Sequence, residues 1–460
     1  MVNRVRITFT NKPLTAWGGL ATIIGKFLEK INFRSWIESN IPITETSNNG
    51  RGIYEKVLSQ MITVLSGGSR FSHLLWWSHG KEVFQKIFNI AWLPAAASTL
   101  TRFWNKISTQ KLAEIMGTAC RQFARQLVGW AAIIEDDLNF DSSVLTRYGH
   151  QQGAKKGYNP KKKGRPSHHP LLSFLSSGYV LNFWNRSGDT ASAEGIIDFF
   201  KQTIASLGSQ FKVRKILCDT GFYLIEFIEY LESWRYIYII AAPLMEILQH
   251  QIRHLHNWQV IDKGIEIADF YFKHQDSKWT KERRYVVVRQ HVPSRPAATG
   301  KQPRLFQDLE EWKSYRVSLL VTNNETSTAE QVWRDYRPRA NDENAIKDLK
   351  EGYNLDTFNL TNFWATEAVL NMICLVFYNL IHFVNQTFIN VVTPKEQLKT
   401  LRLKYFIVPG ELGSAGGYSI LRLGLSGKKL REKLQAMLTQ IHLCSKTLNC
   451  NAVNGKICVT

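Results

Sequence analysis

Four residues in the segment 336–350, YRPRANDENAIKDLK, keep gaps that suit chemistry on phosphates. They fit the pattern Y-x2-R-x3-E-x6-K and are Tyr336, Arg339, Glu343 and Lys350. A helix should begin after Pro338, because the polar pair Asn341–Asp342 suits a helix start. Glu343 and Lys350 then share one helix face. A carboxylate followed by lysines suits a site for a divalent metal and phosphates. A solvated helix end with Glu–Lys pairs is the alternative.

Two aspartates stand where predicted strands end, and with Glu343 they form a candidate site. Asp141 lies near the end of the segment 130–143, WAAIIEDDLNFDSS, and Asp219 closes 212–219, KVRKILCD. Carboxylates that converge from strand ends and a helix can hold two Mg²⁺ ions roughly 3.5–4 Å apart, and Mn²⁺ suits the same hard oxygen ligands. Asp141 is preferred because small residues follow it. The competing acids are Glu135, Asp136, Asp137, Asp189 and Asp342.

The chain is strongly basic. Its 460 residues include 58 Lys and Arg against 38 Asp and Glu, a formal charge of +20. This excess predicts a polyanionic partner, nucleic acid first and an acidic membrane surface second. The segment 149–169 concentrates cations without any acid. We interpret it as a contact for the DNA backbone, with a merely solvated loop as the alternative. Its candidate residues are Lys155, Lys156, Lys161, Lys162, Lys163 and Arg165.

No feature of the sequence predicts secretion or a membrane span. The six cysteines form no C-x2-C pair, so reduced thiols in a cytosolic protein are expected. The first residues contain no apolar region of a secretory signal. The most apolar run, Val369–Val384, holds two asparagines and a histidine and is predicted to be a buried helix.

The expected elements indicate a mixed α/β sheet with flanking helices. Apolar residues recur at helical spacing up to about residue 128. There the segment 97–108, ASTLTRFWNKIS, suits either a DNA-recognition helix or an ordinary bundle. Strands and helices then alternate before further strands interrupted by a Pro/Gly-rich loop. The expected division is a helical DNA-binding segment at 1–128, the sheet at 129–241, a β-rich insertion at 242–325, the return to the core at 326–390, and a helical C-terminal region at 391–460.

The chain resembles the DDE transposases of bacterial insertion sequences, most closely the insertion-sequence 1380 family. The signature with fixed gaps is that of the wider insertion-sequence 4 superfamily. The resemblance covers most of the chain and includes the stretches STLTRF, LNFDSSVLTRYGHQQGAKKGYNPKKKGRPSHHPLL and LCDTGFY. FDSS and CDTGF alone are weak signals. Four residue types at three fixed gaps, behind two correctly placed aspartates, are a strong one.

The resemblance implies an RNase H-like core, split by the insertion, with Asp141, Asp219 and Glu343 as the catalytic and metal-binding triad. It also implies that Tyr336, Arg339 and Lys350 contact DNA phosphates near the transposon end. Relatives often carry aspartate where this chain has Asn139, which is therefore not expected to be an essential ligand. In the superfamily a tryptophan of the insertion can stack on a flipped base. Trp279 and Trp312 are candidates, with a packing role as the simpler alternative.

The sequence therefore predicts a cut-and-paste DNA transposase in the bacterial cytoplasm. It would bind the inverted repeats at the ends of a double-stranded element, hydrolyse them with two metal ions and join the 3′-OH ends to target DNA. Synapsis of two ends predicts a homodimer on DNA, by analogy. Two alternatives stay open: a domesticated, non-catalytic DNA-binding protein, and a metal-dependent nuclease without strand transfer.

Overall fold

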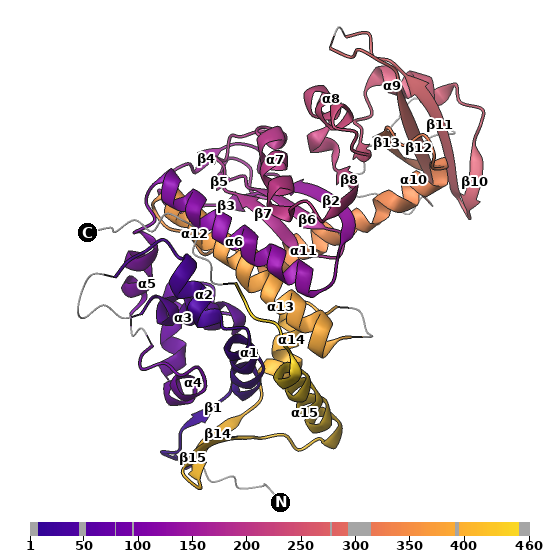
Figure 1. The fold of residues 1–460 in the computed structure, drawn as a ribbon. Helices are drawn as coiled ribbons and strands as arrows, with labels where there is room; N and C mark the ends of the chain where they lie inside the picture. Colours follow the sequence, from indigo (N-terminus) through magenta and orange to yellow (C-terminus); the bar gives the residue numbers. More distant parts are fainter. Residues whose placement is uncertain are drawn as a thin grey trace, which may run out of the picture. The chain divides into compact units, whose positions relative to one another are not determined.

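The computed structural model describes residues 8–45, 52–78, 80–93, 96–276, 278–292, 314–391 and 395–449. The chain forms two compact units, and Figure 1 labels most of their α-helices and β-strands. The first unit comprises Met1–Ala132, Leu145–Ala154 and Lys347–Thr460, and the second comprises Ile133–Val144 and Lys155–Ile346. This two-way division does not test the five expected segments, which stay a prediction.

A nine-stranded mixed sheet forms the centre of the second unit. The parallel pairs are β2 with β8 and β8 with β9, and all other neighbours are antiparallel. The prediction of a mixed α/β fold is confirmed. In spatial order the strands are β10 (Gln259–Asp262), β11 (Ile265–Phe272), β12 (Arg283–His291), β13 (Tyr315–Thr322), β9 (Tyr238–Ala241), β8 (Lys212–Cys218), β2 (Glu135–Ser142), β6 (Leu171–Leu175) and β7 (Val180–Trp184).

The strands of the expected insertion extend this sheet. β13 pairs with β9, with Leu320 opposite Ala241 and Val321 opposite Ile240. The apolar side chains Leu217, Ile239 and Leu320 are buried in one cluster that spans this junction. Because main-chain hydrogen bonds and a common core join the two sets of strands, the insertion and the strands that carry Asp141 and Asp219 form one continuous sheet.

Helices and short strands complete the second unit. The basic segment is partly a β-ribbon, in which Lys155 pairs with Ser167 across β4 and β5. α11 (Ala340–Glu351) begins in this unit, and its residues from Lys347 on belong to the first. The remaining elements are β4 (Lys155–Lys156), β5 (Pro166–His168), α7 (Ile196–Leu207), η2 (Thr220–Phe222), α8 (Ile225–Ser233), α9 (Glu246–Arg253), α10 (Ala329–Tyr336) and η5 (Arg337–Arg339).

The first unit is mainly helical. The chain from Phe363 to Ile389 is the one helix, in the described part of the chain, long and apolar enough to cross a membrane, and 94% of its most apolar stretch is buried inside the protein. The prediction of a buried helix is confirmed. Phe27 of α1 stacks on Phe383, so the first helix packs on this core helix. The elements before residue 155 are β1 (Leu14–Thr15), α1 (Gly18–Lys30), α2 (Phe33–Asn40), α3 (Ile53–Leu65), η1 (Phe71–Ser78), α4 (Lys81–Ile87), α5 (Ala97–Trp104), α6 (Gln110–Trp130) and β3 (Leu145–Thr146).

The C-terminal region is not entirely helical, contrary to expectation. β14 and β15 form an antiparallel hairpin, and β1 pairs with β14. Gly416 and Gly417 make its turn with φ of +56° and +79°, a conformation that glycine adopts without strain. The later elements of this unit are α12 (Phe363–Asn371), η6 (Met372–Tyr378), α13 (Asn379–Val384), η7 (Asn385–Ile389), α14 (Leu398–Leu401), η8 (Arg402–Phe406), β14 (Gly410–Ala415), β15 (Tyr418–Leu423) and α15 (Lys428–Leu443).

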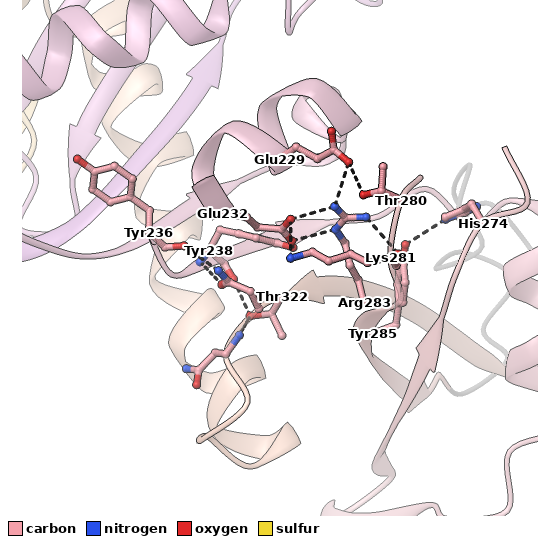
Figure 2. Close-up of polar contacts among 12 residues, drawn as sticks. Glu229, Glu232, Tyr236, Tyr238, His274, Thr280, Lys281, Arg283, Tyr285 and Thr322 are labelled. Carbon is pink, nitrogen blue, oxygen red and sulfur yellow. Dashed lines mark hydrogen bonds and ion pairs between the residues drawn. The ribbon is translucent and has the colours of Figure 1, made fainter. Parts of the chain in front are cut away.

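A buried ion pair fastens α8 to β12 in the second unit. Figure 2 shows the guanidinium of Arg283 facing Glu229 and Glu232, with 2.9 Å from Nε and from Nη2 to the two carboxylate oxygens of Glu232. The hydroxyl of Tyr238 donates to the same carboxylate at 2.9 Å. Arg283 is buried, so its charge depends on these partners.

Glu232→Ala should therefore destabilise the protein by about 3–5 kcal/mol, because it leaves the Arg283 charge buried without its main partner. The measurement is urea-induced unfolding followed by far-UV circular dichroism. Glu226→Ala on the same helix is the matched control, since its ion pair with Lys278 is solvent-exposed. A loss below about 1 kcal/mol, the range of exposed pairs, would contradict this role of Glu232.

Candidate active site

Two parallel strands bring the first two predicted acids together. Asp141 is the penultimate residue of β2, and Asp219 directly follows β8. In the register of these strands Phe140 pairs with Cys218, the residues just before the two acids. Carboxyl ends of neighbouring parallel strands share one sheet edge, which is where α/β folds commonly place their sites.

Arg339 bridges the two aspartates. Its Nη2 lies 3.1 Å from Oδ2 of Asp141 and 3.5 Å from Oδ2 of Asp219. Arg339 is 8% exposed. Burial would lower the pKa of its guanidinium, but Asp141 and Asp219, together with Tyr336, raise it above its usual value. Arg339 thus stays charged and offsets the repulsion between the two carboxylates.

The Asp141 carboxyl is the most constrained of the predicted triad. It is 7% exposed, and burial is the main reason that its pKa rises to about 6. Arg339 and the backbone N–H of Ser142, which donates to Oδ1 at 2.7 Å, lower this pKa. Asp219 and Glu343 raise it, so both acids lie within electrostatic reach of Asp141.

Glu343 occupies the first turn of α11 and is exposed. Nowhere in the described parts of the chain do three His, Cys, Asp or Glu side chains form a group that could hold a metal ion. The donor chemistry still fits Mg²⁺ or Mn²⁺, because the acids are carboxylates at one sheet edge that already bind a cationic group, Arg339.

Asp342 and Asn139 form a buried pair beside the triad. Asn139 Nδ2 donates to Asp342 Oδ1 at 3.0 Å, which links β2 to α11 one residue before Glu343. Asp342 is 3% exposed, and burial raises its pKa to about 7. In the sequence, Asp342 was a competing acid and Asn139 stood where relatives often carry aspartate. The structure shows that the two side chains are hydrogen-bonded to each other, a contact that neither position alone predicts.

The signature residues have different surroundings. The Tyr336 hydroxyl donates to the Cys218 carbonyl at 3.1 Å, which fixes the end of α10 beside Asp219. Lys350 lies near the end of α11, in the first unit. Contacts of Tyr336, Arg339 and Lys350 with DNA stay predictions.

The basic segment is exposed at every predicted cation. Lys155, in β4, forms an ion pair with Asp189 at 3.2 Å. The exposed side chains are those of Lys155, Lys156, Lys161, Lys162, Lys163 and Arg165. Their accessibility is compatible with phosphate contact, which stays a prediction.

Trp279 is half-buried in an aromatic cluster. Its ring centre lies 4.3 Å from that of His274 and 5.4 Å from that of Tyr223, and the Arg283 guanidinium lies over it at 5.2 Å. These contacts give Trp279 the packing role that the sequence left as an alternative, while base stacking stays a prediction. Trp312, the second candidate, lies outside the described residues.

A hydrogen-bonded chain beside Asp141 was not predicted. Ser142, His169 and Ser192 are linked, with 3.1 Å from His169 Nε2 to Ser142 Oγ and 3.2 Å between the two serine oxygens. His169 is the last residue of the basic segment 149–169 and was not among its predicted site residues. The available signal was the position of Ser142 directly after Asp141.

Comparison with known proteins decides the family. The chain matches the family model described as transposase DDE domain group 1 over residues 2–443. The chain belongs to this family of DDE transposases. No curated protein is significantly similar to it. Seven chains of solved structures match, among them that of the cryo-EM structure of a piggyBac transposase synaptic complex with hairpin DNA. That match has 13% identity and a TM-score of 0.43, and covers 84% of this transposase and 79% of the other chain.

The raised pKa of Asp141 makes a prediction about stability. Its pKa is about 6 in the folded protein against an ordinary value of 3.8, so the folded state holds the extra proton between these values. The contribution of this carboxyl to stability therefore falls as the pH rises from about 4 to 6. Asp141→Asn should remove the penalty and stabilise the metal-free protein at pH 8, by at most roughly 3 kcal/mol, but not at pH 4.

Unfolding by urea in the presence of EDTA, at both pH values, measures this difference. Asp198→Asn, an exposed acid on α7, is the control and should change stability equally little at pH 4 and pH 8. An Asp141→Asn effect that is the same at both pH values would refute the raised pKa.

Proposed function

We propose that this transposase is a cut-and-paste enzyme that cleaves DNA at the inverted repeats of its own element and joins the 3′-OH ends to a target. The observation that carries the proposal is the pair Asp141 and Asp219, held at one sheet edge by Arg339, with Glu343 in electrostatic reach. Three acids on two strands and a helix suit phosphodiester chemistry, and the family is one of transposases.

Asp141, Asp219 and Glu343 would hold the divalent ions, Mg²⁺ or in its place Mn²⁺. Two such ions supply an activated water or 3′-hydroxyl and stabilise the leaving oxygen. Arg339 is paired with both aspartates, so a metal ion held by these acids would take the place of at least one of its ion pairs. Its guanidinium would then be available to a DNA phosphate, for which bidentate recognition by arginine is well suited.

The surrounding residues would hold the DNA and the geometry of the acids. Tyr336 keeps Arg339 beside the ends of β2 and β8 through its bond to Cys218. The Asn139–Asp342 pair fixes the first turn of α11, and with it Glu343, against β2. The exposed lysines of 155–163 add sequence-independent attraction for the DNA backbone. Lys350 would add a further phosphate contact.

Several finer points belong to this proposal. They are an RNase H-like core, membership of the insertion-sequence 1380 family and the insertion-sequence 4 superfamily, end recognition by residues 1–128, a homodimer that brings two ends together, and action on DNA in the bacterial cytoplasm. A nuclease without strand transfer shares the same acids. The family assignment favours strand transfer, and the intact acids disfavour a non-catalytic DNA-binding protein.

Glu343→Gln tests the catalytic assignment directly. A supercoiled plasmid that carries the gene's flanking repeats is incubated with protein and Mg²⁺, and the breaks are mapped. The wild type should cut at the repeat ends, and Glu343→Gln should cut at least 100-fold more slowly while retaining repeat binding, because removal of one stabilising group costs roughly 10²–10³ in rate. Glu330→Gln is the control, because Glu330 is a half-buried acid on α10 whose ion pair is with Arg334 of the same helix. Wild-type cleavage that Glu343→Gln leaves unchanged would refute the triad.

Replacing Lys161, Lys162 and Lys163 together by alanine should weaken binding equally for repeat and unrelated DNA. Each phosphate contact contributes a slope of about 0.9 to the fall of log K with log salt, so three lost contacts should reduce the slope by about 2.7. Fluorescence anisotropy between 50 and 300 mM KCl measures it. The triple Lys→Arg variant should keep the wild-type slope. An unchanged slope in the alanine variant would mean that these side chains are only solvated.

A further inference from the structure

The chain of Ser142, His169 and Ser192 has a defined direction. His169 is buried, and its Nδ1 lies 2.8 Å from the carbonyl oxygen of Thr190, which can only accept a hydrogen bond. Nδ1 therefore carries a proton and donates to this oxygen, and Nε2 lies 3.1 Å from the Ser142 oxygen. His169 thus holds the Ser142 hydroxyl in place, and that hydroxyl donates to the Ser192 oxygen at 3.2 Å.

The two hydroxyl groups lie next to both aspartates. Ser142 directly follows Asp141 and donates its backbone N–H to that carboxylate. Ser192 lies against Gly221, where an added Cβ would be 2.9 Å from the Ser192 Cβ and 3.0 Å from Oδ1 of Asp219. The Gly221 N–H in turn donates to Asp219 at 2.8 Å. The serine pair is therefore positioned beside the carboxyl ends of β2 and β8.

A buried arginine holds the loop that carries Ser192. Arg186 donates to the carbonyl oxygens of His169, Ala191, Ser192 and Glu194 at 2.7–3.3 Å. It is 7% exposed, and its Nη2 has no hydrogen-bond partner in the part of the chain that the structure describes. Four contacts to main-chain oxygens fix the loop without neutralising the arginine, whose positive charge favours an anion nearby.

We propose that Ser142 and Ser192 form a subsite for a non-bridging oxygen of the DNA phosphate at this site, with His169 as a positioning residue. The inference rests on the proposed function and adds residues to it. The Ser192 hydroxyl is suited to this place because a neutral group can donate to a phosphate oxygen without competing for the metal-binding carboxylates, and Ser142 holds it in position. Because Ser192 accepts from Ser142, its own proton can point to the phosphate, while Ser142 stays in place beside His169.

Cleavage of repeat-end DNA with a single Rp or Sp phosphorothioate at the scissile phosphate tests the subsite. Ser192→Ala should cut normal DNA roughly 10–100-fold more slowly, the range for losing a hydrogen bond to a charged group. In the wild type, the diastereomer with sulfur at the subsite should show the larger ratio of oxygen rate to sulfur rate, because sulfur is a poor hydrogen-bond acceptor. In Ser192→Ala this ratio should fall towards that of the other diastereomer, because the variant has no hydroxyl group that could donate to the phosphate. Repeat binding and the thermal midpoint should stay near wild type.

The positioning role of His169 has its own variants. His169→Asn lacks the Nε2 contact with the Ser142 oxygen, so it should slow cleavage as Ser142→Ala does. The double variant should be no slower than either single variant, because both act through the Ser142 hydroxyl. Ser206→Ala on α7 is the matched serine control. The subsite would be overturned if the losses of cleavage rate in the two single variants added up in the double variant. It would also be overturned if the ratio of oxygen rate to sulfur rate stayed unchanged for both diastereomers, because these residues would then have only a structural role.

The outcomes separate the subsite from the proposed function. If the wild type fails to cut its repeat ends, the proposed function is overturned and the subsite with it. If the wild type cuts its repeat ends, and both Ser142→Ala and Ser192→Ala cut them as fast as the wild type, the subsite alone is overturned.

Discussion

Repulsion between Asp141 and Asp219 is the constraint around which the second unit is organised. Two carboxylates at neighbouring strand ends need a positive partner, and Arg339 supplies it from a segment 198 residues beyond Asp141. Its side chain reaches them because the single turn η5 separates α10 from α11. The same segment is anchored by Tyr336 on the Cys218 carbonyl and by Asp342 on Asn139. Three short contacts thus position the start of the helix that carries Glu343.

This arrangement is costly without a ligand. Asp141 and Asp342 are buried acids whose pKa values rise to about 6 and about 7, so their ionised forms are disfavoured in the folded protein. Strongly shifted pKa values of this kind are typical of functional sites, where a substrate or metal ion can neutralise the charged groups. The nine hydrogen-bonded strands of the sheet, including those of the insertion, stabilise the unit against the cost of these buried acids.

Much of the fold could be predicted from the sequence because its strands have the usual apolar runs and turn residues. The strands near KVRKILC and YIYIIAA, and the buried helix from Phe363, follow from local pattern. The C-terminal hairpin did not, because the segment 413–417 has little intrinsic β preference and β14 pairs with β1, which is far away in the sequence. The joining of the insertion to the sheet also escaped, since the pairing of β13 with β9 is a contact over about eighty residues.

The candidate site was predicted in its acids but not in its partners. Strand ends and the fixed gaps of the signature identify Asp141, Asp219 and Glu343. Arg339 was expected to face DNA, and the structure gives it two aspartates instead; whether it also binds DNA stays a prediction. Asn139 and Asp342 meet across 203 residues, and His169 meets Ser142 across 27. Spacing along the chain carries no information about such side-chain pairs, which depend on how strands and loops are aligned.

The most direct test of this account is Mn²⁺ binding to the DNA-free protein, measured by electron paramagnetic resonance titration of free Mn²⁺. The account predicts that Asp219→Asn weakens binding, and that Arg339→Gln strengthens it, because the cation that competes for both carboxylates is gone. Thermal unfolding confirms that each variant is folded. Weaker binding in a folded Arg339→Gln variant, or binding unaffected by Asp219→Asn, would contradict the claim that Arg339 stands in for a metal between these acids.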